Sequence, residues 1–435
     1  MMVPDHHSVL GTRLKRREFL STTARVTAGM AGILVAKTPP IYAATRTLTM
    51  MTWNHFVSAS DDILRRTARE FGRANRCQVK IDFIPHRDTY VKVAKEQETR
   101  KGHDIVFLFF SKPRLHHQDL ATLDFVDALG RELGGWYDLA RDACQVESRW
   151  VALPWYYIGG PMTYREDLYQ KHGFAVPTTW ETWKETGKKI KETSGEKVGI
   201  ALSQTEDASF SHYVLLWAHG ASTVDKESQV AINSPGTRLA LDYMKDLYES
   251  CMTNEVLSWD DSSNNQAFLG GKYSWVHNGV SIYFVAKNKA PDIAKVMNHA
   301  LTPSGPGGQH SGAVPINYGI WKFAEQKELA KEFLQHLMNP GLLEEMFHAT
   351  LTYNSPTFKN GEHFDWGKDP KTAQLKNYGK TAHLVGWPGP ADHRSERARA
   401  EWIVPNMFTF YVTGKKSLEE SVSWGEGELK RIYEA

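Results

Sequence analysis

RWVALPWYYIGGPMTYREDLYQKHGFAVPTTWETW, residues 149–183, is the segment from which the fold prediction starts. An apolar run in it ends in three aromatic residues, Trp155, Tyr156 and Tyr157. The flexible step that follows contains Gly159 and Gly160, and adjacent glycines suit a chain that leaves one lobe and enters another. Aromatic residues beside such a crossing would line a cleft. The alternative is a core strand that ends in an ordinary Gly-Gly-Pro turn, and these residues alone do not separate the two.

The length of the chain also favours two lobes. With 435 residues it exceeds what one hydrophobic core usually holds. Its 41% hydrophobic and 23% charged residues are typical of a soluble globular protein. The three cysteines, Cys77, Cys144 and Cys251, are odd in number and widely spaced, so we expect small buried residues rather than a full set of disulfides or a metal site.

Residues 1–44 have the features of a targeting segment. The pair Arg16-Arg17 is followed by Phe19-Leu20, then by an Ala/Gly-rich run and by small residues suited to cleavage near Ala44. The apolar run is too short to span a bilayer, so the pattern predicts a twin-arginine signal peptide and a soluble protein in the periplasm. A short amphipathic N-terminal helix is the alternative.

Removal of this segment would change the charge balance. It holds 6 of the 52 Lys and Arg and 2 of the 50 Asp and Glu, which leaves 46 basic and 48 acidic residues and a net charge of −2. A nearly neutral chain gives no electrostatic reason to expect a nucleic acid partner.

Residues 47–110 read as strand, helix, strand, helix, strand. Strands that alternate with helices predict a parallel sheet with right-handed crossovers. Ser60 is the expected N-cap of the first helix, and Asp61 is expected to pair with Arg65 on its outer face. In such sheets ligands bind beyond the carboxyl ends of the strands. This rule predicts a binding edge at the ends of the first and third strands, formed by Trp53, Asn54, His55, Phe110 and Ser111.

Sequence signatures of catalysis are absent. The chain has no Gly-x-Ser-x-Gly, no His-Glu-x-x-His and no P-loop. His116-His117 is an adjacent pair of the kind that rarely binds a metal. Asp260 and Asp261 are expected to be solvated or to cap a helix. The helical stripe Phe210, Tyr213, Val214 and Trp217 is expected to be core. We therefore expect no enzyme activity, no metal and no cofactor.

Four pieces in a fixed order also carry a family resemblance: Leu-Pro-Trp-Tyr-Tyr, Tyr164-Arg165-Glu166-Asp167-Leu168, Gly173, and Pro-Thr-Thr-Trp180-Glu181. Together they resemble the first interlobe crossing of the extracellular solute-binding proteins of family 1, the maltose-binding type that serves ABC importers. The resemblance implies an α/β fold of the two-lobed periplasmic-binding-protein type, with parallel-rich sheets flanked by helices and three interlobe crossings. It covers residues 45–435 and is weakest over 360–395.

The resemblance also implies the division of the chain. The N-terminal lobe would comprise 45–158 with 302–350, and the C-terminal lobe 162–298 with 356–435. The hinge crossings would lie near 158–162, 298–303 and 349–356, with Gly159 and Gly160 as the first hinge. By the same analogy the cleft would receive Trp275, Asn278, Tyr318, Gly319 and Trp402, in addition to the residues named above. Val280-Ser281 stands where the family often has Trp, so Trp275, Asn278 and Tyr283 all remain candidates for its role.

The function implied is capture of a sugar or sugar-like solute between the lobes and its delivery to the permease subunits of an ABC importer, by a protein expected to be a monomer. The 14 Trp and 17 Tyr suit such a ligand, because aromatic faces stack on sugar rings. Two alternatives stay open. One is a periplasmic hydrolase exported by the twin-arginine route. The other is the same binding fold with a polyol or a phosphorylated polyol as its ligand.

Overall fold

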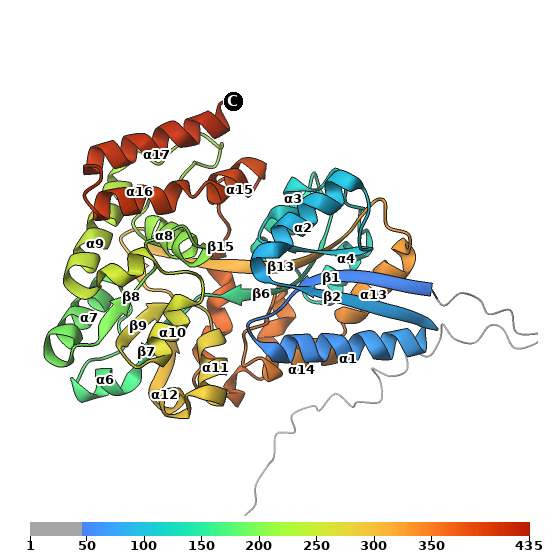
Figure 1. Cartoon of the computed structure of the whole chain (residues 1–435), viewed down its shortest axis with the longest axis horizontal. Coiled ribbons are helices and arrows are strands. Elements are labelled where there is room, and N and C mark those ends of the chain that lie inside the picture. The colour runs from blue at the N-terminus through green and yellow to red at the C-terminus, as the bar shows by residue number, and fades with distance from the viewer. Residues whose placement is uncertain (1–45) are drawn as a thin grey trace, which may run out of the picture. The chain divides into compact units, whose positions relative to one another are not determined.

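Two separate β-sheets, each with helices around it, organise the chain into two lobes (Figure 1). The computed structural model describes residues 46–435, which form one unit. The predicted signal peptide with Arg16 and Arg17 lies outside the described residues.

The first sheet has the strand order β14-β6-β13-β3-β1-β2, and β15 pairs with the start of β13. Its β1–β2 and β1–β3 pairs are parallel, whereas β3–β13, β13–β6 and β6–β14 are antiparallel. The sheet is therefore mixed, with parallel pairs among β1, β2 and β3 and between β13 and β15. The bounds are β1 (Arg46–Trp53), β2 (Cys77–Ile84), β3 (Ile105–Phe109), β6 (Leu153–Gly159), β13 (Ser311–Ile320), β14 (Ser355–Pro356) and β15 (Ala382–His383).

The strand–helix order predicted for residues 47–110 is confirmed, with α1 (Ser58–Ala74) and α2 (His86–Thr99) between the strands. The start of α1 differs from the prediction. Val57 occupies the N-cap position, and Asp61 is buried rather than on the outer face. Asp61 faces inward because its carboxylate bonds Nδ1 of the buried His55. Arg65 pairs instead with Asp62.

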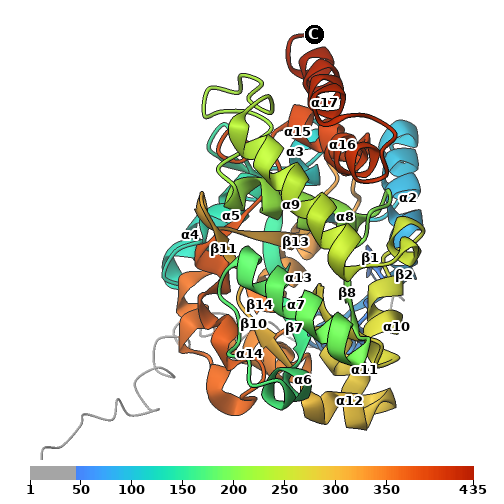
Figure 2. The same ribbon diagram turned by 90° about the vertical axis from the view of Figure 1, so that its left-hand side faces the viewer.

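The second sheet has the order β10-β7-β9-β8, in which only the β8–β9 pair is parallel. Its strands are β7 (Met162–Arg165), β8 (Lys197–Gly199), β9 (Tyr273–His277) and β10 (Met297–Ala300). Helices α7 (Trp180–Ser194) and α9 (Pro235–Cys251) pack together on this lobe, α7 against β8 and β9 (Figure 2). Two short antiparallel pairs complete the strands, namely β4 (Gln145–Val146) with β5 (Arg149–Trp150) and β11 (Ser304–Gly305) with β12 (Gly308–Gln309).

The helix starts follow the capping signals closely. Ser234 caps α9, which has Pro at its first position, and Ser417 with Glu420 forms a capping box. Thr178 and Glu181 have the spacing of a capping box, but the box at the start of α7 lies one residue later, with Thr179 as the cap and Thr182 as its partner. The other helices are α3 (Lys112–Leu115), α4 (Phe125–Glu132), α5 (Asp138–Cys144), α6 (Glu166–Lys171), α8 (Glu206–Ala218), η2 (Asn254–Leu257), α10 (Ser263–Leu269), α11 (Ser281–Lys289), α12 (Pro291–Val296), α13 (Lys327–Leu337), α14 (Pro340–Ala349), η3 (Lys359–His363), η4 (Trp366–Lys368), η5 (Ala373–Lys380), α15 (His393–Ala400), α16 (Ile403–Val412) and α17 (Leu418–Tyr433).

The chain passes from the first sheet to the second between the end of β6 and the start of β7, at Gly160-Pro161. It returns between β10 and β13. Further on, β14 still pairs with β6, Phe358 belongs to the first core, and Trp366 belongs to the second. Phe347 already belongs to the second core, so contacts with both cores alternate through residues 347–366. The exact lobe boundaries and the count of three crossings remain predictions.

The two cores are apolar and aromatic. One surrounds the first sheet and includes Trp155 and Trp321, and the other surrounds the second sheet and includes Trp183 and Trp275. The three cysteines are buried free thiols, which confirms them as small core residues. None of the helices in residues 46–435 is both long and apolar enough to cross a membrane.

Candidate functional site

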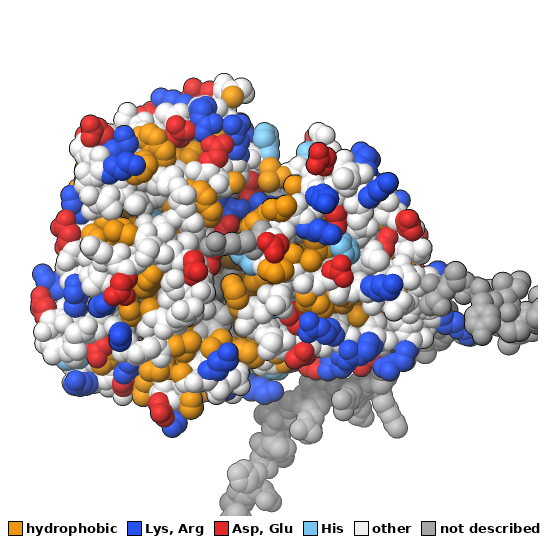
Figure 3. Space-filling model, in the orientation of Figure 1, with side chains coloured by type: hydrophobic (Ala, Val, Ile, Leu, Met, Phe, Trp, Pro, Cys, Tyr) orange, Lys and Arg blue, Asp and Glu red, His pale blue; other side chains and the backbone are white. Residues whose placement is uncertain are grey.

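A cavity lies between the two sheets, at the carboxyl ends of β1 and β3. Its empty volume, including the space open to solvent, is about 690 Å³. The surface is notched between the two lobes, with hydrophobic side chains gathered along the notch (Figure 3). The cavity is lined by Trp53, Phe56, His86, Phe109, Phe110, Ile158, Gly159, Gly160, Glu206, Asp207, Phe210, Asp261, Asn265, Asn278, Gly279, Ser281, Val314 and Tyr353.

The first sheet supplies the aromatic side of the cavity. Trp53 is the last residue of β1, and its ring centroid lies 5.2 Å from the rings of both Phe56 and Phe109. Trp53 is only 1% exposed, whereas Phe56 is 45% exposed. Packing within the protein therefore uses most of the Trp53 ring but leaves much of Phe56 uncovered.

Phe110 follows β3 and is held in an unusual backbone conformation. Its φ is +51°, a left-handed value that costs a bulky residue free energy and persists only where the surroundings fix it. The backbone N–H of Phe110 donates to the carbonyl oxygen of Pro315 at 3.1 Å. The side-chain amide of Asn317 donates to the Phe110 carbonyl oxygen at 2.8 Å. These contacts turn the chain sharply and place the Phe110 ring at the cavity.

The second lobe supplies the polar side. Glu206 and Asp207 form the first turn of α8, where the helix dipole favours negative charge. The Asp207 backbone N–H donates to Asp261 at 3.2 Å, and the Asn264 amide donates to the Asp207 carboxylate at 2.6 Å. Burial, together with the neighbouring Asp261 charge, raises the pKa of Asp207 well above its usual value.

Amide groups complete this polar side. The Asn278 side chain donates to the side-chain oxygen of Asn265 at 2.5 Å and accepts from the Gly279 N–H at 2.6 Å. The carboxylates and amides can form hydrogen bonds with the hydroxyls of a polyhydroxylated molecule, and the aromatic rings beside them can cover its apolar faces. Among the side chains that the structure describes, no Lys or Arg lines the cavity.

The structure brings together part of the predicted site. Trp53, Phe110 and Asn278 line one cavity with the predicted hinge residues Gly159 and Gly160. The other predicted ligand contacts do not line it. They are Asn54, His55, Ser111, Trp155, Tyr156, Tyr157, Trp275, Tyr318, Gly319 and Trp402.

Three of these residues are held at the edge of the first sheet by other partners. Asn54 is exposed, with its backbone N–H bonded to the carbonyl oxygen of Ile84 at 2.8 Å. His55 is buried against Asp61. Ser111 is buried, and its hydroxyl donates to Glu396 at 2.6 Å.

The aromatic triplet on β6 packs into the interior. Trp155 and Tyr156 line a smaller cavity with Leu343 and Met346, and Tyr157 stacks on Tyr378 at 6.3 Å. Consecutive residues of a strand point to opposite faces, and both faces of β6 are covered.

The remaining four lie away from the cavity as well. Trp275 packs on Trp183 at 5.6 Å, the Tyr318 hydroxyl bonds that of Thr52 at 2.8 Å, and Gly319 lies against Leu120. Trp402 occupies the N-cap position of α16. Of the candidates near residue 280, only Asn278 lines the cavity; the Tyr283 hydroxyl instead donates to Asp369 at 3.0 Å.

Several lining residues were not predicted. Phe210 belongs to the stripe expected to be core, and Asp261 to a pair expected to be solvated or capping. Asp260 is exposed and accepts from the N–H of Ser262, the N-cap residue of α10, at 2.9 Å. Phe56 follows a strand end by three residues, and this position was the one available sequence signal for it.

The comparisons with known proteins bear on this geometry. The family model of the bacterial extracellular solute-binding proteins matches residues 67–374, more than half of the chain. The chain belongs to this family. The match includes all of the cavity residues except Trp53 and Phe56.

Two similar proteins have names that describe a role. The chain is 24% identical over 187 residues to a probable ABC transporter-binding protein of Deinococcus radiodurans, covering 41% of this chain and 44% of the relative. It is 29% identical over 143 residues to the putative ABC transporter periplasmic-binding protein YcjN of Escherichia coli, covering 30% and 32%. The matched segments thus span less than half of either relative.

Solved structures agree in fold over nearly the whole described chain. The maltose-bound MalE3 of T. maritima has a TM-score of 0.75 at 22% identity, covering 89% of this chain and all of that one. A solute-binding protein of Agrobacterium radiobacter K84 in complex with ribitol has a TM-score of 0.73 at 18% identity, covering 89% and 99%. The GacH receptor of Streptomyces glaucescens, solved with acarbose, has 0.73 at 18%, covering 90% and 99%. At these identities the likeness shows the two-lobed periplasmic-binding-protein fold.

Proposed function

We propose that this protein captures a neutral, polyhydroxylated solute, a sugar or a polyol, in the cavity between its lobes and delivers it to an ABC importer. The observation that carries the proposal is the cavity itself. It joins the half-exposed ring of Phe56 on one lobe to the carboxylates and amides of α8, Asp261 and Asn278 on the other. The role of the two relatives and the sugar and ribitol bound by the similar structures support it.

Binding would act through closure. A ligand that touches both lobes binds the closed form more tightly and shifts the population toward it. We propose Gly159 and Gly160 as the hinge, since they line the cavity where the chain passes between the sheets. No bond of the solute is broken in this scheme, and the closed form of a monomeric binding protein is what the permease subunits would recognise.

The charges of the cavity select among solutes. The carboxylates of Glu206, Asp207 and Asp261 line the cavity, and that of Glu206 is ion-paired with Arg399. A phosphorylated polyol would place its negative charge next to these carboxylates, which is unfavourable at short range. We therefore expect a phosphorylated polyol to bind at least about tenfold more weakly than the same polyol without phosphate.

Phe56 gives the sharpest test of the proposal. A thermal-shift screen of residues 46–435 against sugars and polyols identifies the solute, and calorimetric titration gives its Kd. Phe56→Ala removes an exposed ring, so we expect a loss of roughly 1.4 kcal/mol of binding free energy, or about tenfold in Kd, with little change in the Tm of the unliganded protein.

Leu239→Ala is the matched control. Leu239 is 54% exposed on α9 and does not line the cavity, so this substitution should leave the Kd unchanged. A Kd that is the same for Phe56→Ala and the wild type would contradict the proposed site. A screen without any sugar or polyol that binds would contradict the proposed solute class.

We also propose that the protein reaches the periplasm by the twin-arginine route. The pair Arg16-Arg17 ahead of Phe19-Leu20 supports this, as does membership of an extracellular family. Replacement of both arginines by lysine should leave precursor in the cytoplasm. An unchanged periplasmic yield would exclude this route.

A further inference from the structure

A second, smaller cavity adjoins the first. Its empty volume is about 320 Å³. Three residues line both cavities and form the wall between them, namely Phe110, Glu206 and Phe210. Tyr213, Trp217, His383, Val385 and Arg399 line only the second cavity. The wall decides whether a ligand in the first cavity can extend into the second.

Phe210 closes the wall by filling a slot between two backbone segments. A methyl group added at Gly160 would lie 2.2 Å from its ring, and one added at Gly312 would lie 2.6 Å from the opposite edge. The ring is also 5.1 Å from the ring of His277. These contacts leave the Phe210 ring little freedom to swing aside.

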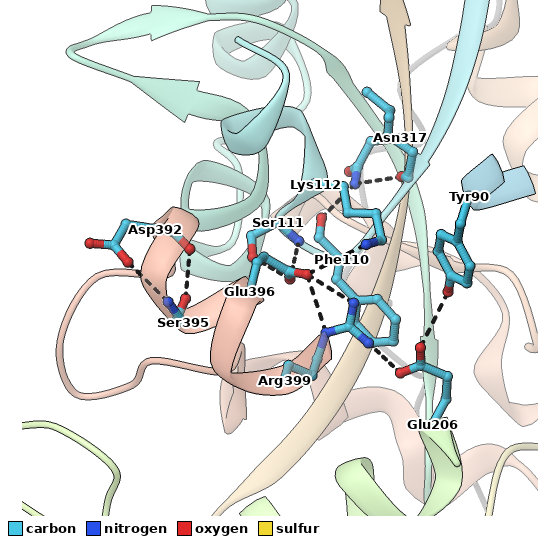
Figure 4. A network of polar contacts seen from close by, with 11 residues as sticks. Tyr90, Phe110, Ser111, Lys112, Glu206, Asn317, Asp392, Ser395, Glu396 and Arg399 are labelled. Atoms are coloured by element: carbon cyan, nitrogen blue, oxygen red, sulfur yellow. Dashed lines mark hydrogen bonds and ion pairs between the residues drawn. The ribbon is translucent and has the colours of Figure 1, made fainter. Parts of the chain in front are cut away.

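Glu206 is fixed in the wall from both sides (Figure 4). The Tyr90 hydroxyl donates to one carboxylate oxygen at 3.3 Å, and the Arg399 guanidinium bonds the other. Arg399 also lies over the ring of Phe110, 4.2 Å from its centroid. One buried guanidinium of α15 therefore holds two of the three wall residues.

Arg399 is fixed in turn by Glu396, one turn earlier on α15. The Arg399 guanidinium donates to one Glu396 oxygen at 2.8 and 3.2 Å, and the Ser111 hydroxyl donates to the other at 2.6 Å. Burial opposes the charge on Glu396, but Arg399 and Lys112 outweigh it and lower the pKa of Glu396 to about 2. The support of the wall thus stays ionised throughout the physiological pH range.

We infer that the wall of Phe110, Glu206 and Phe210, held by Arg399, is a specificity determinant that ends the binding cavity and selects short solutes over longer oligosaccharides. This inference rests on the proposed function. A ligand confined to the first cavity keeps its contacts with both lobes, whereas added rings that point toward the second cavity meet a closely packed, ion-paired wall. The second cavity has aromatic side chains of its own, so opening the wall would give an added ring a surface to bind.

The test compares Kd values along ladders of sugars with the wild type and with a variant whose wall is open. The probes are gluco-, manno- and xylo-oligosaccharides of one to four rings. Phe210→Ala removes the ring from the wall and leaves the ion pairs of Arg399 in place. Phe210 also lines the first cavity, so its removal changes the Kd of short sugars as well. The readout is therefore a ratio within one ladder, namely the Kd of the best one- or two-ring sugar divided by the Kd of the three-ring sugar.

We expect the wild type to prefer the shorter sugar and Phe210→Ala to shift the ratio toward the longer one by about tenfold or more. Phe210→Leu, which retains more apolar volume, should shift it less and guards against a poorly folded alanine variant. Val385→Ala is the control, because it enlarges the second cavity without opening the wall, and its ratio should equal that of the wild type.

An unchanged ratio in both Phe210 variants would overturn the inference, as would an equal shift in Val385→Ala. A wild type that binds three- and four-ring sugars most tightly would overturn it too, while leaving the proposed solute class intact. If no member of any ladder binds the wild type or the variants, the proposed sugar function fails and this inference fails with it.

Discussion

The effects of substitutions at Gly160 and Phe210 on stability should be strongly coupled, because the Phe210 ring occupies the space that a side chain at position 160 would need. The Cβ of an alanine at 160 would lie 2.2 Å from Cε1 and 2.4 Å from Cζ of Phe210. Carbon atoms in favourable contact are roughly 3.5 Å apart, so the ring would have to retreat by about 1.3 Å. Gly312 blocks retreat on the other side.

Forcing a methyl group into a packed site of this kind costs about 1–3 kcal/mol. We therefore expect Gly160→Ala to lower the free energy of unfolding by that amount. The backbone itself is not the cause, since Gly160 is not among the described residues with positive φ and alanine can adopt its conformation. In the Phe210→Ala background the methyl group meets no ring, and Gly160→Ala should then cost less than about 0.5 kcal/mol.

Urea denaturation of residues 46–435, followed by circular dichroism, gives the four unfolding free energies of the cycle. We predict that the double variant is more stable than the sum of the single effects by about 1 kcal/mol or more. Gly427→Ala, where an added Cβ meets no atom within 4 Å, should not destabilise the protein. Strictly additive effects of Gly160→Ala and Phe210→Ala would refute this account of the wall.

Two further predictions concern aromatic and titratable residues. Trp53→Ala should weaken solute binding and lower the Tm, because Trp53 lines the cavity and is buried. Tyr156→Ala should lower the Tm alone, because Tyr156 is buried but does not line the cavity. An unchanged Kd for Trp53→Ala in calorimetry would contradict this. Burial lowers the pKa of His212 to about 3 and those of His277 and His299 to about 4. In the unfolded chain these histidines bind protons near pH 6.5, whereas in the folded protein they stay neutral to lower pH. The free energy of unfolding should therefore fall as the pH drops from about 6.5 toward 4, by roughly 3 kcal/mol per histidine at pH 4. Denaturation curves at several pH values would measure this fall. An unfolding free energy that is constant over this range would contradict the burial of neutral imidazoles.

The sequence predicted the parts of the site that follow from regular local structure. Trp53 and Phe110 were found because the strands before them are short, apolar and alternate with helices, and a topological rule then places their ends at one edge. Gly159 and Gly160 line the cavity, and the sequence singled them out as a proposed hinge because two adjacent glycines end an apolar strand.

The remaining contacts depend on tertiary packing that local patterns do not reveal. Trp155, Tyr156 and Tyr157 form a conspicuous triplet, but a strand covered on both faces buries all of them. Phe210 continues an apolar helical stripe, and only the approach of Gly160 and Gly312 places it between two cavities. Asp61 has the spacing of a surface ion pair, yet the buried His55 draws it inward.

Local sequence patterns did not predict the polar network around Arg399 either. Its members come from α2, the end of β3, α8 and α15, and the residues that meet in it are up to 285 positions apart. No spacing rule connects such segments. The packing of α15 against α3 brings Glu396 to Ser111, and Arg399 then reaches Glu206 on α8.

The most direct test of the central claim is a crystal structure of the protein with the solute found by the thermal-shift screen. We predict density for one solute molecule in the cavity, with a ring or carbon chain against Phe56 and hydroxyl groups within hydrogen-bond distance of Asp207, Asp261 or Asn278. Density for the solute at another place on the protein, with this cavity holding only water, would contradict the account.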